Sequence, residues 1–230
     1  MMKKNVINED EIFEINPNYT VKVETFQPGN VKVVMVDDFY KNPWDVRQLA
    51  LDIPASRNRR IRGMNPAYRV NAFYELDSMF WIYDQLIRTH FHEYANDIDT
   101  EYLRQSFRNA TFMVNVMQSE DLPPLCPHMD NTSGINFAST IYLNEPNECK
   151  GGTSFYTYGG KTYYEDQHQM QTIDIHQYVT DSVGDFEMIG MAPMLFNRMV
   201  LYKQEALHTA YVKPGMFHGD VHRLNQQFFI

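Results

Sequence analysis

The chain has 230 residues, about one and a half times a typical domain of roughly 150 residues, so we expect one domain with long loops. Hydrophobic residues make up 43% and charged residues 21%, which excludes a disordered chain and provides for a sizeable core. The 20 Lys and Arg residues against 29 Asp and Glu residues give a formal net charge of −9, which argues against nucleic acid as a partner.

The sequence also lacks the signals of export and membrane insertion. No apolar run approaches the roughly 20 residues that cross a bilayer. Lys3 and Lys4 are not followed by the apolar stretch of a signal peptide. We therefore expect a cytoplasmic protein that does not span a membrane, in which Cys126 and Cys149 stay reduced.

The first half of the chain predicts a polar arm followed by one strand and two helices. Residues 1–30 are polar and rich in turn residues, with room for one short strand. A β-branched run then predicts a buried strand, and Asn42-Pro43 is typical of a helix start. We expect both helices to pack on one face of a sheet. The predicted elements are a strand at Tyr19–Glu24, a strand at Val31–Val36, a helix from Pro43 to about Leu51 and a helix at Met79–Tyr94.

From Thr111 onward, short apolar runs alternate with Gly- and Pro-containing breaks. This texture predicts a mainly β fold with flanking helices, arranged as an antiparallel sandwich or jelly roll. The polar segment Tyr163–Gly190 interrupts the rhythm and is interpreted as an insertion or lid. The predicted strands are Phe112–Met117, Ile135–Leu143, Thr153–Tyr158, Met194–Tyr202, Leu207–Val212 and Leu224–Ile230.

Two His-x-Asp pairs have the spacing of metal ligands. His128 and Asp130 are two residues apart, so in an extended strand both side chains project to one face. His218 and Asp220 have the same spacing, but only His222 follows them as a further imidazole. A site of two histidines and one carboxylate needs a third ligand from a distant strand.

His128 has five histidines downstream, and the best placed of them is His208, at the start of a predicted strand. Arg223 opens the last predicted strand, where a buried cation needs an anion to meet it.

In this order the motifs resemble the catalytic core of the iron(II)- and 2-oxoglutarate-dependent dioxygenases. Within that superfamily the chain resembles the prolyl-4-hydroxylase branch, and most closely an uncharacterised group of bacterial and phage proteins. The resemblance covers about residues 111–230. The motifs that carry it are Pro127-His128-Met129-Asp130, Thr140-Ile141-Tyr142-Leu143-Asn144, Gly151-Gly152-Thr153, Phe196 to Tyr202, His208, and Arg223 with the strand after it.

The resemblance implies a cupin-like double-stranded β-helix, the jelly roll, with iron held by His128, Asp130 and His208. It implies that Arg223 binds the far carboxylate of the cosubstrate 2-oxoglutarate, because its planar fork matches a carboxylate. Tyr142 matches a position that assists at this carboxylate, and Thr140 is a weaker candidate on the same strand face.

The same resemblance implies the reaction and the domain plan. We expect one domain over residues 1–230, with an arm at 1–30, a strand and supporting helices at 31–110, and the catalytic core at 111–230. The reaction implied consumes O₂ and 2-oxoglutarate, forms succinate and CO₂, and hydroxylates a peptidyl or free amino-acid side chain. Asp130 favours hydroxylation over halogenation, since halogenating relatives have a small residue at that position.

Several alternatives stay open at this point. The interval from His208 to Arg223 is longer than in compact prolyl hydroxylases, which keeps His218 and His222 as alternative ligands. Two other functions also fit the residues: a jelly-roll binding module without catalysis, and a cupin-type metal enzyme that does not use 2-oxoglutarate. The substrate would be selected by the loops Ala55–Val70, with the basic run Arg57–Arg62, and Tyr163–Gly190, neither of which contains a motif that identifies it. The oligomeric state is equally open.

Overall fold

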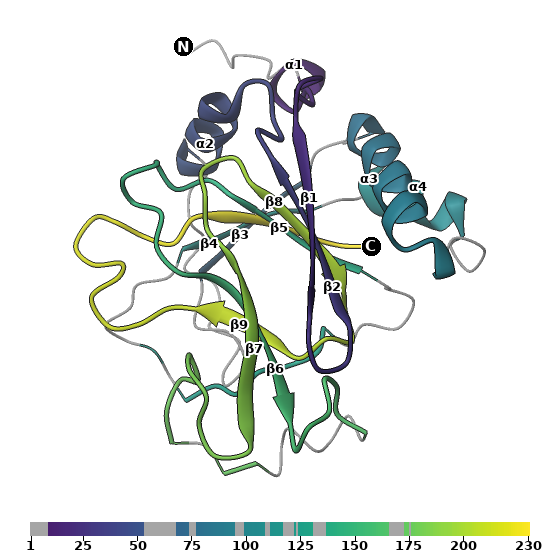
Figure 1. Ribbon diagram of the computed structural model, residues 1–230. Coiled ribbons are helices and arrows are strands. Elements are labelled where there is room, and N and C mark those ends of the chain that lie inside the picture. The colour runs from purple at the N-terminus through teal and green to yellow at the C-terminus, as the bar shows by residue number, and fades with distance from the viewer. Residues whose placement is uncertain are drawn as a thin grey trace.

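A computed structural model describes residues 9–52, 68–73, 77–94, 99–108, 111–116, 122, 124–130, 137–165, 173–174 and 176–230. Over these ranges the protein is mainly β, with two antiparallel sheets and a few helices (Figure 1). None of the helices in these ranges is long and apolar enough to cross a membrane.

The larger sheet has seven strands in the described residues, in the order β1-β2-β8-β5-β10-β4-β3. Every pair of neighbours in it is antiparallel, and most neighbours are distant in sequence. Its strands are β1 (Thr20–Phe26), β2 (Val31–Asp37), β3 (Tyr68–Phe73), β4 (Thr111–Val116), β5 (Phe137–Tyr142), β8 (Met199–Lys203) and β10 (Asn225–Phe229).

The smaller sheet has the order β7-β6-β9, with β6 (Gly152–Tyr158) between β7 (Phe186–Pro193) and β9 (His208–Tyr211). On the free side of β9, His128 forms an antiparallel bridge with His208. The segment that contains His128 therefore lies beside β9, as a further strand of this sheet would.

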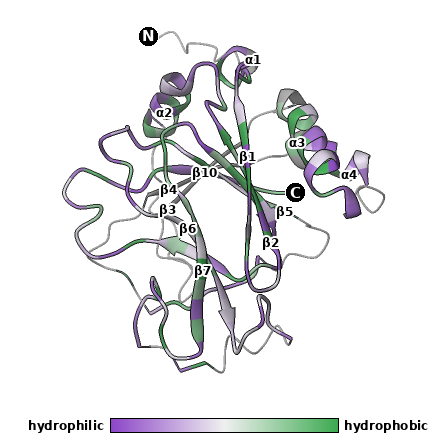
Figure 2. Ribbon diagram, viewed as in Figure 1, coloured by the Kyte–Doolittle hydropathy of each residue, from purple (hydrophilic) through white to green (hydrophobic). Residues whose placement is uncertain are grey.

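The helices cover one face of the larger sheet (Figure 1). Apolar residues of α2, α3 and α4 share one buried cluster with residues of β2, β5, β8 and β10. The helices α2 and α3 also carry hydrophilic residues, as expected of helices with one face in solvent (Figure 2). The helical segments are α1 (Glu9–Ile12), α2 (Pro43–Asp52), α3 (Asp77–His90), the 3₁₀ turn η1 (His92–Tyr94) and α4 (Thr100–Arg108).

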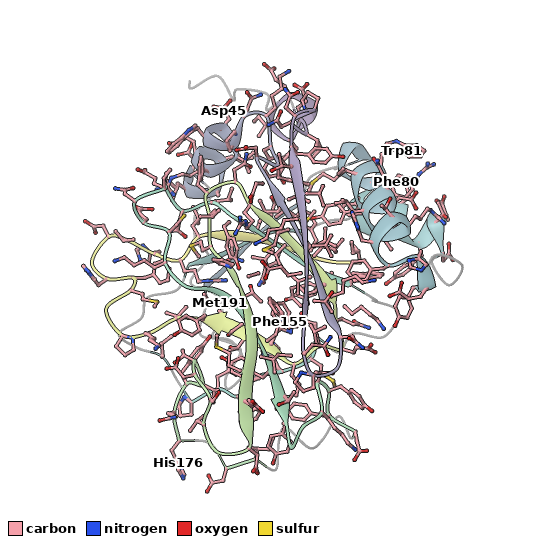
Figure 3. The ribbon with its side chains drawn as sticks, in the orientation of Figure 1. Asp45, Phe80, Trp81, Phe155, His176 and Met191 are labelled. Atoms are coloured by element: carbon pink, nitrogen blue, oxygen red, sulfur yellow. The ribbon has the colours of Figure 1, made fainter. Side chains whose placement is uncertain are left out.

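The opposite face of the larger sheet packs toward the smaller sheet. Because side chains alternate along a strand, Val34 and Val36 of β2 contact the helix-side cluster, whereas Val33 and Met35 belong to the cluster between the sheets. That second cluster includes Phe155 of β6, which lies in the middle of the molecule (Figure 3). We call this side of the larger sheet its inner face.

Most predicted elements are confirmed. The strand at Val31–Val36 and the helix from Pro43 are β2 and α2, and both predicted helices pack on one sheet face. The later predicted strands contain β5, β9 and β10, while β4 and β6 begin one residue before the predicted ranges and β8 ends one residue after its range.

Other boundaries differ from the prediction. The strand predicted at Tyr19–Glu24 is confirmed as β1, but it continues to Phe26 and pairs along its whole length with β2, so this part of the predicted arm belongs to the sheet. The predicted insertion at 163–190 includes the first residues of β7, which pairs with β6. The second helix ends at His90 rather than Tyr94. The strand β3 and the helix α4 were not predicted.

Candidate metal centre

The structure brings His128, Asp130 and His208 together. One ligand atom from each of the three side chains lies within 4.8 Å of the others. The Asp130 carboxylate lies 3.2 Å from His208 Nε2 through Oδ2 and 3.8 Å from His128 Nε2 through Oδ1. The two imidazole rings are 4.7 Å apart between centroids.

Backbone hydrogen bonds hold these three residues in place. The N–H of His128 donates to the carbonyl of His208, and the N–H of His208 donates back to the carbonyl of His128, both at 2.9 Å. The N–H of Asp130 donates to the carbonyl of Gln204 at 3.0 Å. This last hydrogen bond ties Asp130 to the turn before β9, outside the register of the bridge, and the two-residue spacing lets His128 and Asp130 face one side.

The surroundings of His208 favour a defined ring orientation. This side chain is buried, and its Nδ1 lies 2.9 Å from the carbonyl oxygen of Ala206. A proton on Nδ1 donated to that carbonyl leaves the lone pair on Nε2, which faces Asp130. Burial lowers the pKa of His208, but the Asp130 carboxylate and the two hydrogen bonds outweigh it, so the pKa is raised above 6.5.

This donor set fits a divalent metal ion. Two imidazoles and one carboxylate are ligands that iron(II) and related first-row metals accept, and three protein ligands on one side leave coordination positions open. The carbonyl of Ala206 supplies the outer hydrogen bond that metal-bound histidines commonly make. The three residues could therefore hold a metal ion.

A buried cation, Arg223, lies two residues before β10. Arg223 is 3% exposed, and its Nη1 donates to Asn225 Oδ1 at 2.6 Å. Its Nη2 lies 3.4 Å from the carbonyl of Gly152, and its Nε has no hydrogen-bond partner among the residues that the structure describes. Within those residues no carboxylate forms an ion pair with Arg223. A buried guanidinium of this kind suits an anionic ligand.

Tyr142 and Thr140 lie on the inner face of β5. The hydroxyl of Tyr142 is 2.7 Å from Thr153 Oγ1, and the Arg223 guanidinium lies 5.5 Å from the Tyr142 ring. Burial raises the pKa of the Tyr142 hydroxyl, and the charge of Arg223 opposes part of this rise. Thr140 is 3% exposed and is two residues from Tyr142, on the same side of the strand.

A family model for a family of unknown function, DUF6445, matches residues 17–223. The chain belongs to this DUF6445 family. The matched range contains the two histidines, the aspartate and the arginine described above. A search of the curated proteins gives no match.

In this DUF6445 protein, the other histidines that the sequence left open lie elsewhere. His218 is exposed, and His222 Nδ1 lies 3.1 Å from the carbonyl of Asp220, away from the cluster of metal ligands. His176 is exposed beside Asp174 at the lower end of the molecule, far from Phe155 (Figure 3). His168 and the basic run at 57–62 lie outside the described residues.

Sequence reasoning missed two residues of this DUF6445 site. Asn225 is fully buried beside Arg223, and its Nδ2 has no hydrogen-bond partner within the described ranges. Its position two residues after Arg223 was the available signal, since both then share one side of an extended segment. Tyr202 packs its ring against His208, with 4.8 Å between centroids. Tyr202 is far in sequence from the His-x-Asp pair, so no motif indicated that it belongs to the site.

Proposed function

We propose that this protein is an iron(II)- and 2-oxoglutarate-dependent oxygenase of the jelly-roll type. In this proposal it hydroxylates a peptidyl or free amino-acid side chain, with formation of succinate and CO₂. The observation that carries the proposal is the pairing of two features: a cluster of two histidines and one aspartate, and a buried arginine without a carboxylate partner in the described residues.

Tyr202 links these two features. Its ring packs on His208, and it lies on the inner face of β8 in the same cluster as Tyr142. Burial raises the pKa of Tyr202, the Asp130 carboxylate and Tyr142 raise it further, and Arg223 lowers it. Its hydroxyl is therefore within electrostatic reach of both features, as a ligand that spans from the metal ligands to Arg223 would require.

The sheet arrangement supports the jelly-roll assignment. Four strands of the larger sheet, in the order β8-β5-β10-β4, face a smaller sheet in the order β7-β6-β9. The segment at His128 bridges to the free side of β9, where a fourth strand of the smaller sheet would lie. With that segment counted as a fourth strand, two facing antiparallel sheets of four strands each are what a double-stranded β-helix requires.

The residues have separate roles in this proposal. His128, Asp130 and His208 would hold iron(II), and the bound metal would supply the redox chemistry with O₂. Arg223 would bind the far carboxylate of 2-oxoglutarate through its planar fork, with Asn225 and Tyr142 beside it. The carboxylate of Asp130 fills the place that a halide needs in halogenating relatives, so hydroxylation is the proposed outcome.

Turnover of the cosubstrate tests the proposal. We expect the anaerobically purified protein, given iron(II), 2-oxoglutarate and then O₂, to form succinate even without a primary substrate. Absence of iron-dependent succinate formation, together with absence of 2-oxoglutarate binding, would remove the proposal. Metal binding that 2-oxoglutarate does not perturb would indicate instead a cupin-type metal enzyme or a binding module.

A further inference from the structure

Asn144 holds the backbone on both sides of Arg223. This residue is fully buried, two positions beyond the end of β5. Its Oδ1 accepts from the N–H of Leu224 at 2.7 Å, and its Nδ2 donates to the carbonyl of His222 at 2.7 Å. Leu224 and His222 are the two residues that flank Arg223. One amide side chain therefore fixes the peptide groups from which the arginine side chain extends.

The segment that leads to Arg223 is irregular. Residues 212–222 contain neither helix nor strand, and the ladder of β10 begins only at Asn225. The carbonyl of Leu224 accepts from the N–H of Leu143 at 2.9 Å, which ties the next peptide group to the end of β5. We call the two hydrogen bonds from the Asn144 side chain to the backbone on either side of Arg223 the clamp. Because the position of a long side chain depends on its backbone, this clamp sets where the guanidinium lies.

Asn144 is itself held by a second layer of contacts. Its Nδ2 lies 3.3 Å from Glu148 Oε2, which also accepts from the N–H of Glu145 at 3.1 Å. Arg47 of α2 reaches Glu148 at 3.5 Å and Glu145 at 3.1 Å. Glu145 and Glu148 thus share one arginine partner, but only Glu148 contacts the Asn144 side chain.

We infer that Asn144 is a positioning residue for Arg223 and thereby sets the affinity of the site for a dicarboxylate. This inference rests on the proposed function, because it assumes that 2-oxoglutarate is the anion at Arg223. It adds a residue that does not touch the ligand but determines the place of the group that does. The metal ligands lie on other segments, so they do not depend on the clamp.

The test measures binding of 2-oxoglutarate and of Mn²⁺ separately, by anaerobic calorimetry on the full chain. We expect Asn144→Ala to raise the dissociation constant for 2-oxoglutarate by about tenfold or more, because two hydrogen bonds are lost. The dissociation constant for Mn²⁺ should stay within about twofold, as expected for independent sites.

Asn197→Ala is the matched control. Asn197 is also buried, and its side chain brackets the backbone of Tyr40 in the same way, with two hydrogen bonds of 2.9 Å. We expect Asn197→Ala to lower the free energy of unfolding at least as much as Asn144→Ala does. The backbone at Asn197 has a φ of 63°, which asparagine tolerates better than alanine does. We expect this variant to bind 2-oxoglutarate like the parent protein.

If Asn144→Ala does not fold, variants of Glu145 and Glu148 test the inference instead. Glu148→Ala should weaken 2-oxoglutarate binding, whereas Glu145→Ala should not. Equal binding by the folded Asn144 variant and the parent, or an equal loss of Mn²⁺ and 2-oxoglutarate, would overturn the clamp and leave the proposed function standing. A parent protein that binds Mn²⁺ but no 2-oxoglutarate would overturn the proposed function itself.

Discussion

His128 and His208 are joined through their backbones by two reciprocal hydrogen bonds of 2.9 Å. Backbone hydrogen bonds therefore hold two of the three candidate metal ligands next to each other. Asp130 is fixed in the same way, through its N–H and the carbonyl of Gln204. A site organised by backbone pairing does not need the ion to assemble it, so the side chains can be altered one at a time without loss of the fold.

The first prediction concerns metal binding. Replacing His128, Asp130 or His208 by alanine should weaken binding of Mn²⁺ or iron(II) by more than the roughly 10- to 100-fold typical of outer-shell partners. Calorimetry under anaerobic conditions measures this. The exposed His176 provides the control, since His176→Ala should bind the metal like the parent protein. Normal metal binding by all three variants would rule out this site.

The second prediction concerns the anion. Arg223→Ala should weaken 2-oxoglutarate binding by about 10- to 100-fold, because a charge-assisted pair is lost, while metal affinity is kept. Arg223→Lys should fall between, since lysine keeps the charge but not the planar fork.

A second buried arginine gives the comparison for Arg223. Arg198 pairs with Asp37 through two hydrogen bonds. Arg198→Ala should lower the free energy of unfolding but leave the affinity of the folded protein for 2-oxoglutarate unchanged. The reverse pattern for the two arginines would contradict the assignment of the anion site.

The third prediction separates the two faces of β5. Thr140→Val replaces a hydroxyl on the inner face by a methyl group of similar size and should weaken 2-oxoglutarate binding by about two- to tenfold, the size of one hydrogen bond. Its neighbour Ser139 faces the helices and lies 2.7 Å from the Tyr83 hydroxyl. Ser139→Ala should cost about 1 kcal/mol of stability and change no affinity. Unaltered binding by Thr140→Val would remove Thr140 from the site.

The fourth prediction concerns pH and the free thiols. Burial raises the pKa of Cys149 to about 11, with a weaker contribution from Glu148 in the same direction. About a thousandth of this thiol is ionised at pH 8, against roughly a quarter of an unperturbed thiol. Because the thiolate is the reactive form, alkylation by iodoacetamide should be slow at pH 8 and rise steeply up to pH 11.

Peptide mass spectrometry measures the rate at Cys149 separately from that at Cys126, whose pKa burial also raises. The urea-unfolded protein serves as the reference and should react at the rate of a simple thiol. Rapid alkylation of the folded protein at pH 8 would show that Cys149 is not held as described.

The candidate site was more predictable than the fold around it. The two-residue spacing of His128 and Asp130 is a local signal. His208 begins β9, and Arg223 lies two residues before β10, so the apolar runs that predict these strands also locate both residues. The sequence could not show that Arg223 lacks a carboxylate partner within the described residues, since that depends on tertiary contacts.

The missed elements have physical reasons. The strand β7 contains Gly190 and ends at Pro193, residues that usually interrupt strands. A Cβ at Gly190 would come within 2.2 Å of the Phe26 ring, so the glycine reflects close packing against β1 rather than a turn. The helix α4 has only Leu103 and Phe107 as described buried residues, too few to give a clear helical period.

The place of β10 has a consequence for how the protein acquires its structure. This strand lies inside the larger sheet, between β5 and β4, although it is the strand nearest the C-terminus. Until β10 is synthesised, the pair β3 and β4 has no hydrogen-bonded neighbour that joins it to the rest of the sheet. Arg223, which lies just before β10, is also not yet synthesised. Such pairing between distant segments slows folding, so we expect refolding in the range of milliseconds to seconds or slower, with the ligand site among the last parts to form.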